Sequence, residues 1–74
     1  METVIKHTKT IAEYKELKEF MENTAKTFAE AHKQAVERWE HGEISKVWID
    51  ANSNICIEYK DGCWWHYNNK GEWW

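Results

Sequence analysis

Proline is absent from the sequence, and the 74 residues include only three glycines and two cysteines. Two cysteines can close at most one disulfide, which excludes the disulfide-rich scaffolds of small secreted proteins. No stretch approaches the ~20 apolar residues that span a bilayer, and the N-terminal residues lack the apolar segment of a signal peptide. We therefore expect a cytoplasmic protein with free thiols and no membrane partner.

An excess of charge of one sign is also missing, because 10 Lys and Arg face 13 Asp and Glu, for a net charge of −3. A nucleic-acid partner, which requires a basic patch, is therefore not expected. Aromatic residues are abundant instead, with six Trp, three Tyr and two Phe. A chain this short has room for one domain, residues 1–74, and its large rings offset the thin core of so small a domain.

Helical spacing is clearest between residues 10 and 41. Thr10 and Glu13 fit a capping box, in which the Thr10 hydroxyl accepts from the amide of residue 13 and the Glu13 carboxylate accepts from the amide of Thr10. Gly42 is typical of the residue that follows a helix. An apolar stripe recurs at steps of three and four residues, and we interpret the histidine within it as a core residue. The stripe comprises Tyr14, Leu17, Met21, Ala25, Phe28, His32, Ala35 and Trp39.

The length of this helix raises a packing problem. Residues 11–41 would form a helix about 46 Å long, about twice the length of a strand of six or seven residues. Either the helix breaks near Asn23 and Thr24, which are poor helix formers, or the uncovered stripe packs on a second copy of the chain. Because no Gly or Pro interrupts the segment, we favour a continuous helix and a homodimer.

From Glu43 onward the apolar pattern alternates, as expected for strands that are buried on one face. It predicts strands at residues 44–50, 55–60 and 63–67, with a candidate last strand at 72–74 and a candidate edge strand at 3–5. Asp61-Gly62 is the strongest hairpin signal in the chain. The predicted fold class is α+β, with one long amphipathic helix packed on a three- to four-stranded antiparallel β-meander over residues 44–74.

The turns of this meander predict which side chains share a face. If Asp61-Gly62 forms a two-residue turn, Tyr59 lies opposite Trp64, and both belong to the core face with Ile57 and His66. In the preceding hairpin, pairing of the aliphatic residues places Asp50 opposite Asn54.

The opposite face then carries large rings beside charged side chains, where a polar surface is normal. We predict that this face binds a protein partner. The alternative, in which lysine stems or the N-terminal segment cover these rings, is equally compatible with the sequence. The predicted contact residues are Trp48, Trp65, Tyr67, Lys46 and Glu58.

Site chemistry is weakly indicated. Cys63-x-x-His66, with Cys56 and His41, has the composition of a zinc site, but in this register Cys63 and His66 point to opposite faces, whereas zinc ligands converge. Cys56 and Cys63 lie too far apart along the hairpin for a disulfide. No histidine shares a face with either cysteine, and no phosphate loop or hydrolase motif is present. We also expect no cleft of several hundred Å³, and therefore neither a metal, a cofactor nor enzymatic activity.

One segment resembles a known family. Residues 62–71, Gly-Cys-Trp-Trp-His-Tyr-Asn-Asn-Lys-Gly, are similar to the aromatic hairpin of bacterial cell-wall-binding repeats of the choline-binding type. That family is secreted and works as tandem copies, whereas this chain holds one copy. We interpret the resemblance as a shared hairpin pattern.

The sequence therefore favours a small, non-enzymatic protein-binding module. Short chains of this kind are common among accessory proteins of phages and mobile elements, including inhibitors of host defence. This assignment to phages and mobile elements rests on no particular residue. The alternatives are a structural homodimer and a weak binder of single-stranded nucleic acid that stacks bases on exposed rings.

Overall fold

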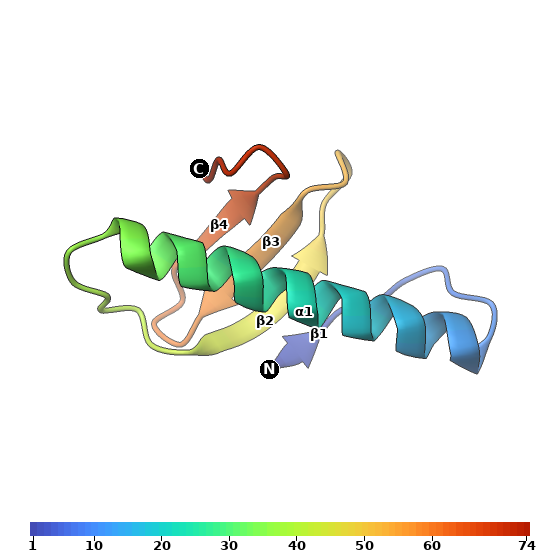
Figure 1. Ribbon diagram of the computed structural model, residues 1–74. Coiled ribbons are helices and arrows are strands. Elements are labelled where there is room, and N and C mark those ends of the chain that lie inside the picture. Colours follow the sequence, from blue (N-terminus) through green and yellow to red (C-terminus); the bar gives the residue numbers. More distant parts are fainter.

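The computed structural model describes all 74 residues, and its single helix, α1, begins at Ile11 and ends at Ala35 (Figure 1). Thr10 caps the helix, because its hydroxyl accepts a hydrogen bond of 3.1 Å from the amide of Glu13. The Glu13 carboxylate accepts from the amide of Lys9, at 2.9 Å, instead of that of Thr10. The predicted start of the helix is confirmed, while one arm of the capping box bonds one residue earlier than expected.

The predicted end of the helix at His41 is wrong. Val36 already has an extended backbone, with φ −106° and ψ 148°. The chain then loops back toward the sheet, where Trp39 packs against the core and its indole N–H donates to the main-chain oxygen of Gly42 over 2.8 Å. Packing of the Trp39 ring from a loop overrides the helical spacing of the sequence. Gly42 has φ +78°, so it serves this loop and not the helix end.

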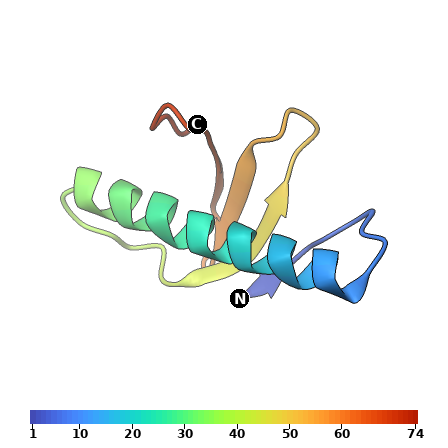
Figure 2. The same cartoon turned by 45° about the vertical axis from the view of Figure 1, so that its right-hand side comes forward.

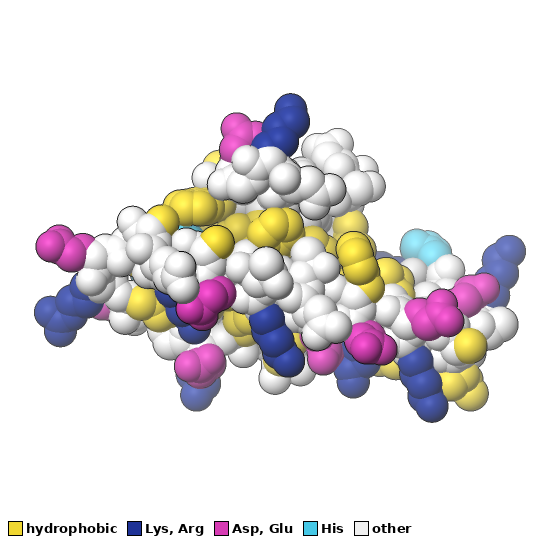
Figure 3. Space-filling view, viewed as in Figure 1, with side chains coloured by type: hydrophobic (Ala, Val, Ile, Leu, Met, Phe, Trp, Pro, Cys, Tyr) yellow, Lys and Arg dark blue, Asp and Glu magenta, His cyan; other side chains and the backbone are white.

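Helix α1 is continuous through Asn23 and Thr24, as we expected. Its 25 residues correspond to a length of about 37 Å. The helix crosses the sheet obliquely, and its first turns extend past the sheet edge, beside the loop that joins β1 to α1 (Figures 1 and 2). Its outward side carries acidic and basic residues along its length (Figure 3). The helix is too polar to be a membrane span.

Four strands form one open sheet in the order β1-β2-β3-β4. Strands β2 (Ile44–Ile49), β3 (Ile55–Tyr59) and β4 (Trp64–Tyr67) form the antiparallel meander that the sequence predicts. An edge strand is present too, but β1 spans Glu2–Thr3 instead of the expected residues 3–5. It pairs with β2 in parallel, so the sheet is mixed. The α+β fold class is confirmed.

Residues 72–74 fold back along β4. Tyr67 forms an isolated bridge with Trp73. His66 and Trp74 exchange two main-chain hydrogen bonds, of 3.0 and 3.2 Å. The C-terminal segment therefore adds a short extension to the sheet beyond β4, and it carries two further indole rings to this edge.

The β2–β3 register is the predicted one. Val47 pairs with Ile57, Lys46 with Glu58, and Trp48 with Cys56, and the main chain of Asp50 bonds that of Asn54 across a three-residue loop. Aliphatic side chains at alternate positions of both strands fix this pairing, because a slip of one residue would expose them. The pairs observed are Lys46 with Glu58, Val47 with Ile57, Trp48 with Cys56 and Ile49 with Ile55.

The predicted β3–β4 register is wrong by one residue. The turn has three residues instead of two: Tyr59 accepts from the amide of Gly62 and donates to the main-chain oxygen of Cys63, both at 2.9 Å. Gly62 has φ +88°, as expected for the left-handed residue that ends a three-residue hairpin loop. Ile57 therefore faces Trp65 rather than His66. This shift exchanges the two faces of β4.

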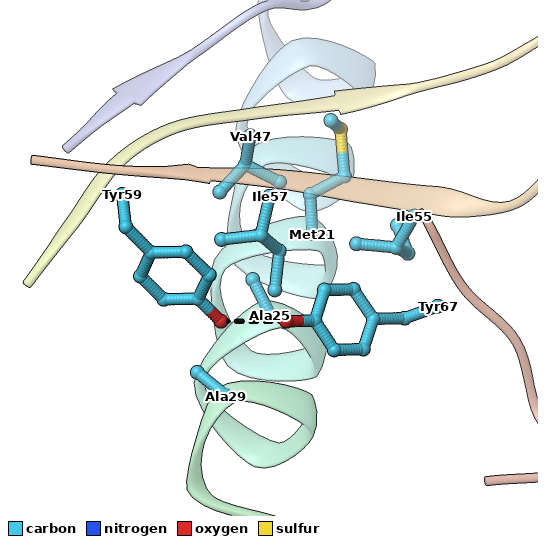
Figure 4. Close-up of a cluster of buried hydrophobic side chains, with 8 residues drawn as sticks. All are labelled: Met21, Ala25, Ala29, Val47, Ile55, Ile57, Tyr59 and Tyr67. Atoms are coloured by element: carbon cyan, nitrogen blue, oxygen red, sulfur yellow. Dashed lines mark hydrogen bonds between the residues drawn. The ribbon is translucent and has the colours of Figure 1, made fainter. Parts of the chain in front are cut away.

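The core lies between α1 and one face of the sheet (Figure 4). Small residues of the helix, Ala25 and Ala29, let the sheet approach closely, and Tyr59 and Tyr67 fill the space with rings whose hydroxyls are 2.8 Å apart. His32 is buried in the same layer, with Nδ1 2.7 Å from the Tyr67 hydroxyl. The buried apolar cluster comprises Met21, Ala25, Ala29, Val47, Ile55, Ile57, Tyr59 and Tyr67.

Candidate functional site

Two of the five predicted contact residues face the helix. Tyr67 is only 1% exposed, and Trp65 packs against the core. The Trp65 ring meets His32 edge to face, with centroids 4.9 Å apart, and lies 5.8 Å from the Tyr59 ring. Their predicted place on an exposed platform is therefore wrong, because the third residue of the hairpin turn reverses the side on which each lies.

The opposite face of the sheet nevertheless carries a row of rings, composed differently from the prediction. Trp64 contacts Trp48 on one side and His66 on the other, with centroid distances of 5.3 and 4.9 Å. Trp74 stacks on His66 at 5.0 Å and an interplanar angle of 3°. We call Trp48, Trp64, His66 and Trp74 the outer aromatic row.

Strand pairing explains how this row assembles. Trp48 lies opposite Cys56, and Cys56 lies opposite His66, so one rung of the sheet runs from β2 to β4. The two hydrogen bonds between His66 and Trp74 extend that rung to the C-terminal segment. Trp64 belongs to the neighbouring rung, opposite Glu58. Side chains on adjacent rungs of one face touch, so the four rings form a continuous surface.

The outer aromatic row is accessible at two of its rings. Trp64 is 47% exposed and Trp74 is 54% exposed, while Trp48 and His66 are half-buried. Lys46 and Glu58 lie directly opposite each other on the same face, and the Lys46 ammonium is 5.6 Å from the centre of the Trp48 ring. The predicted positions of Trp48, Lys46 and Glu58 on the face away from the helix are confirmed by this register.

Cys56 lies within this face and is fully buried. Burial, together with the negative charge of Asp50, raises the pKa of its thiol to about 11. The free thiol is therefore protonated at neutral pH and is a weak nucleophile. Asp50 itself is held by the loop that follows β2, since its carboxylate accepts hydrogen bonds of 2.9 Å from the amides of Asn52 and Asn54.

Both cysteines have a histidine and an aspartate close by, which the sequence did not predict. The donor atoms of Asp50, Cys56 and His66 lie within 4.8 Å of one another, and so do those of His41, Asp61 and Cys63. The hairpin shift brings His66 to the face of Cys56, and the loop after α1 returns His41 to the hairpin tip. Our expectation that no histidine accompanies either cysteine is wrong. The clusters comprise Asp50, Cys56 and His66, and His41, Asp61 and Cys63.

The second of these clusters is an exposed hydrogen-bonded pair with a thiol beside it. His41 Nδ1 and Asp61 Oδ2 are 2.6 Å apart. The hydrogen bond from His41, followed by that from the amide of Cys63, lowers the pKa of the Asp61 carboxyl. Partial desolvation and the charge of Asp61 raise the pKa of the Cys63 thiol. The arrangement anchors the loop after α1 to the hairpin and leaves Cys63 unactivated.

The structure also has a groove, which shares Trp48 with the outer aromatic row, although we expected none of this size. Its volume is about 550 Å³, and it runs between the first half of α1, the end of β2 and the segment after β1. Val4 and Ile5 supply a third wall, which the helix and the meander alone would lack. Its apolar lining includes Val4, Ile5, Leu17, Met21, Trp48 and Ile49.

Comparison of the chain with models of known protein families, with curated proteins and with solved structures finds no match.

Proposed function

We propose that the chain is a small, non-enzymatic protein-binding module that contacts its partner through the outer aromatic row, flanked by Lys46 and Glu58. The observation that carries this proposal is the exposure of Trp64 and Trp74, at 47% and 54%, within a continuous row on the sheet face opposite α1. The two exposed indoles are held in place by the His66 ring between them. They therefore offer a large apolar area at little entropic cost, and tryptophan dominates the binding energy of many interfaces.

The charges beside the row favour a protein partner over nucleic acid. Lys46 and Glu58 oppose each other on the same face, so the immediate rim carries both signs. A protein interface combines an aromatic centre with a mixed polar rim, whereas a nucleic-acid groove needs several uncompensated basic residues. Stacking of single-stranded bases on Trp64 and Trp74 is the alternative for the same surface, and a net charge of −3 opposes it.

The absence of enzymatic activity remains part of the proposal. The Cys56 thiol has a pKa of about 11 and is buried. The Cys63 thiol lies beside Asp61, whose charge raises its pKa rather than lowering it. Neither cysteine therefore has the lowered pKa of a nucleophile, which supports a binding role.

Association of two copies is a second candidate function, and a separate surface favours it. The apolar stripe of α1 continues past the sheet edge, where Ile11 is 74% exposed and Tyr14 is 41% exposed. Tyr14 belongs to the apolar stripe that the sheet buries further along the helix, and Ile11 precedes it by three residues. A second chain packing there would bury apolar area that one copy leaves in water.

The contact surface can be tested with matched ring deletions. The wild-type protein and the variants Trp64→Ser, Trp74→Ser and Phe20→Ser are immobilised and exposed to extract of the source cell. Phe20 is the control, because it is 59% exposed but lies on the helix. We expect one protein to be retained by wild type and Phe20→Ser and lost with both tryptophan variants. Retention by the tryptophan variants and loss with Phe20→Ser would refute the proposal.

A parallel binding measurement with a single-stranded oligonucleotide separates the two partner classes. Saturable binding that is lost in Trp64→Ser would assign the row to nucleic acid and contradict the protein-binding proposal. We expect no saturable oligonucleotide binding at physiological salt, because few phosphates would be neutralised there.

A further inference from the structure

We propose that Asp50, Cys56 and His66 form a binding site for Zn²⁺ or a divalent metal ion of similar ligand preference. This inference does not rest on the proposed function. Each residue offers a different donor atom, and the three donors lie within 4.8 Å of one another on the face opposite α1. Carboxylate oxygen, thiolate sulfur and imidazole nitrogen are all zinc ligands.

The sheet register brings these donors together. Cys56 on β3 lies directly opposite His66 on β4. Asp50 follows the end of β2 two residues after Trp48, the other neighbour of Cys56, so it lies on the same face and the next rung. The three ligands thus come from three segments that are hydrogen-bonded side by side. The two-residue turn expected from the sequence would have placed His66 on the opposite face.

The distances are close to those of a tetrahedral site. Zinc lies about 2.0–2.2 Å from nitrogen and oxygen ligands and about 2.3 Å from sulfur, so tetrahedral ligands lie roughly 3.3–3.6 Å apart. His66 Nε2 and Asp50 Oδ2 are 3.8 Å apart. The most widely separated donor atoms are at most 4.8 Å apart. To reach the separation of tetrahedral ligands they must approach by roughly 1 Å, which small rotations of the Asp50 and His66 side chains supply.

Neighbouring groups orient two of the donors. His66 Nδ1 lies 3.2 Å from the main-chain oxygen of Trp74, which only accepts hydrogen bonds, so Nδ1 donates. In the neutral ring, Nε2 then presents a lone pair toward the Asp50 carboxylate. The amides of Asn52 and Asn54 hold Oδ1 of Asp50, and the Asn54 side-chain amide donates to Oδ2 over 3.2 Å. A metal-ligating histidine is typically held, as His66 is here, by a hydrogen bond that its second ring nitrogen donates.

Two electron-pair donors that face each other repel unless a positive species lies between them. A metal ion between Nε2 of His66 and Oδ2 of Asp50 satisfies both, with the sulfur of Cys56 as third ligand and a fourth position left for water or a partner's side chain. The competing occupant is a proton on Nε2, which satisfies His66 and Asp50 but makes no use of Cys56.

The cluster of His41, Asp61 and Cys63 provides an internal comparison. His41 Nδ1 and Asp61 Oδ2 are only 2.6 Å apart, shorter than the ligand separation in a zinc site, and they form a hydrogen bond. A metal ion would have to break that bond. We therefore assign the metal site to the outer face and use the hairpin-tip cluster as the control.

The test is titration of the reduced, metal-free protein with Co²⁺, followed by its displacement with Zn²⁺. Cobalt bound to a thiolate has a charge-transfer absorption band, which reports sulfur ligation directly. We expect this band to saturate at one Co²⁺ per chain, to disappear when Zn²⁺ is added, and to be lost in Cys56→Ala. Affinity for Co²⁺ should fall at least tenfold in His66→Gln and in Asp50→Asn.

Cys63→Ser and His41→Gln are the matched controls and should bind Co²⁺ as wild type does. Because Cys56 is buried, circular dichroism must show that the Cys56→Ala variant is folded. If that variant is unfolded, His66→Gln and Asp50→Asn still test the site, because His66 and Asp50 are only half-buried. No charge-transfer band in wild type would overturn the proposal and leave a proton as the occupant. Loss of the band in Cys63→Ser or His41→Gln, with retention in His66→Gln, would move the site to the hairpin tip.

Discussion

Replacement of Tyr67 by phenylalanine probes the centre of the core with the loss of a single oxygen atom. The Tyr67 hydroxyl is hydrogen-bonded to His32 Nδ1, at 2.7 Å, and to the Tyr59 hydroxyl, at 2.8 Å. All three residues are buried. The substitution keeps the ring and removes both hydrogen bonds, so it leaves two buried polar groups unpaired.

Each buried polar group left without a partner costs about 1–3 kcal/mol, so we expect Tyr67→Phe, which strands two of them, to lower the free energy of unfolding by about 2–6 kcal/mol. A domain of this length has a total stability of roughly 4–11 kcal/mol. The variant should therefore unfold at a much lower urea concentration with an unchanged slope. Tyr14→Phe removes a hydroxyl from a 41% exposed ring and should change stability by less than about 0.5 kcal/mol.

A double-mutant cycle identifies the cause of the loss. If unpaired groups dominate, Tyr67→Phe should cost about 1–3 kcal/mol less when His32 is already phenylalanine, because one stranded partner is then absent. A loss below about 0.5 kcal/mol for Tyr67→Phe in the wild-type background would refute the reasoning, since it would mean that water reaches His32 and Tyr59.

The remaining predictions concern pH, glycine positions and association. Burial, reinforced by the charge of His41, lowers the pKa of His32 below 6.5, so the unfolded state binds more protons than the folded state. The stability that neutral His32 contributes should be fully present above pH 6.5 and should fall as the pH decreases toward the folded pKa. Urea titrations of His32→Phe should lack this pH-dependent component. Gly42→Ala should lower the melting temperature more than Gly62→Ala does. Both glycines have positive φ, but only at Gly42 would an added Cβ lie close to another residue, 3.2 Å from Lys60. Equal decreases in melting temperature would contradict this. Sedimentation at high micromolar concentration should show a dimer for wild type and a monomer for Tyr14→Glu, and a monomeric wild type would remove the self-association hypothesis.

Local sequence signals were sufficient where a local interaction decides the structure. Thr10 and Glu13 predict the helix start because the cap is formed by neighbouring residues. The β2–β3 register follows from aliphatic residues at alternate positions, so Lys46, Trp48 and Glu58 were placed on the correct face. In these segments, polarity distinguishes one face from the other.

Prediction failed where the deciding contact is distant in sequence. The residues of β4 are Trp64, Trp65, His66 and Tyr67, so no alternation of polarity indicates which face is buried. Asp61-Gly62 is compatible with both two- and three-residue turns, and the fit of the Tyr67 hydroxyl between His32 and Tyr59 matches only the three-residue one. The helix end depends in the same way on Trp39 packing back from a loop.

The candidate site was predicted in part from the sequence. The face that carries it, and its members Trp48, Lys46 and Glu58, could be predicted from strand alternation. Trp64, His66 and Trp74 could not, because one extra residue in the hairpin turn exchanges the faces of β4 and the C-terminal segment then pairs with it. The proximity of His66 to Cys56 has the same origin.

The most direct test of the outer aromatic row is tryptophan oxidation by N-bromosuccinimide, with the modified residues located by tandem mass spectrometry. In the folded protein, Trp64 and Trp74 should react first, because about half of each side chain is exposed. Trp65 is partly buried against the core and should react more slowly than either. Oxidation of Trp65 as fast as Trp74, with Trp64 protected, would restore the two-residue turn and contradict the account.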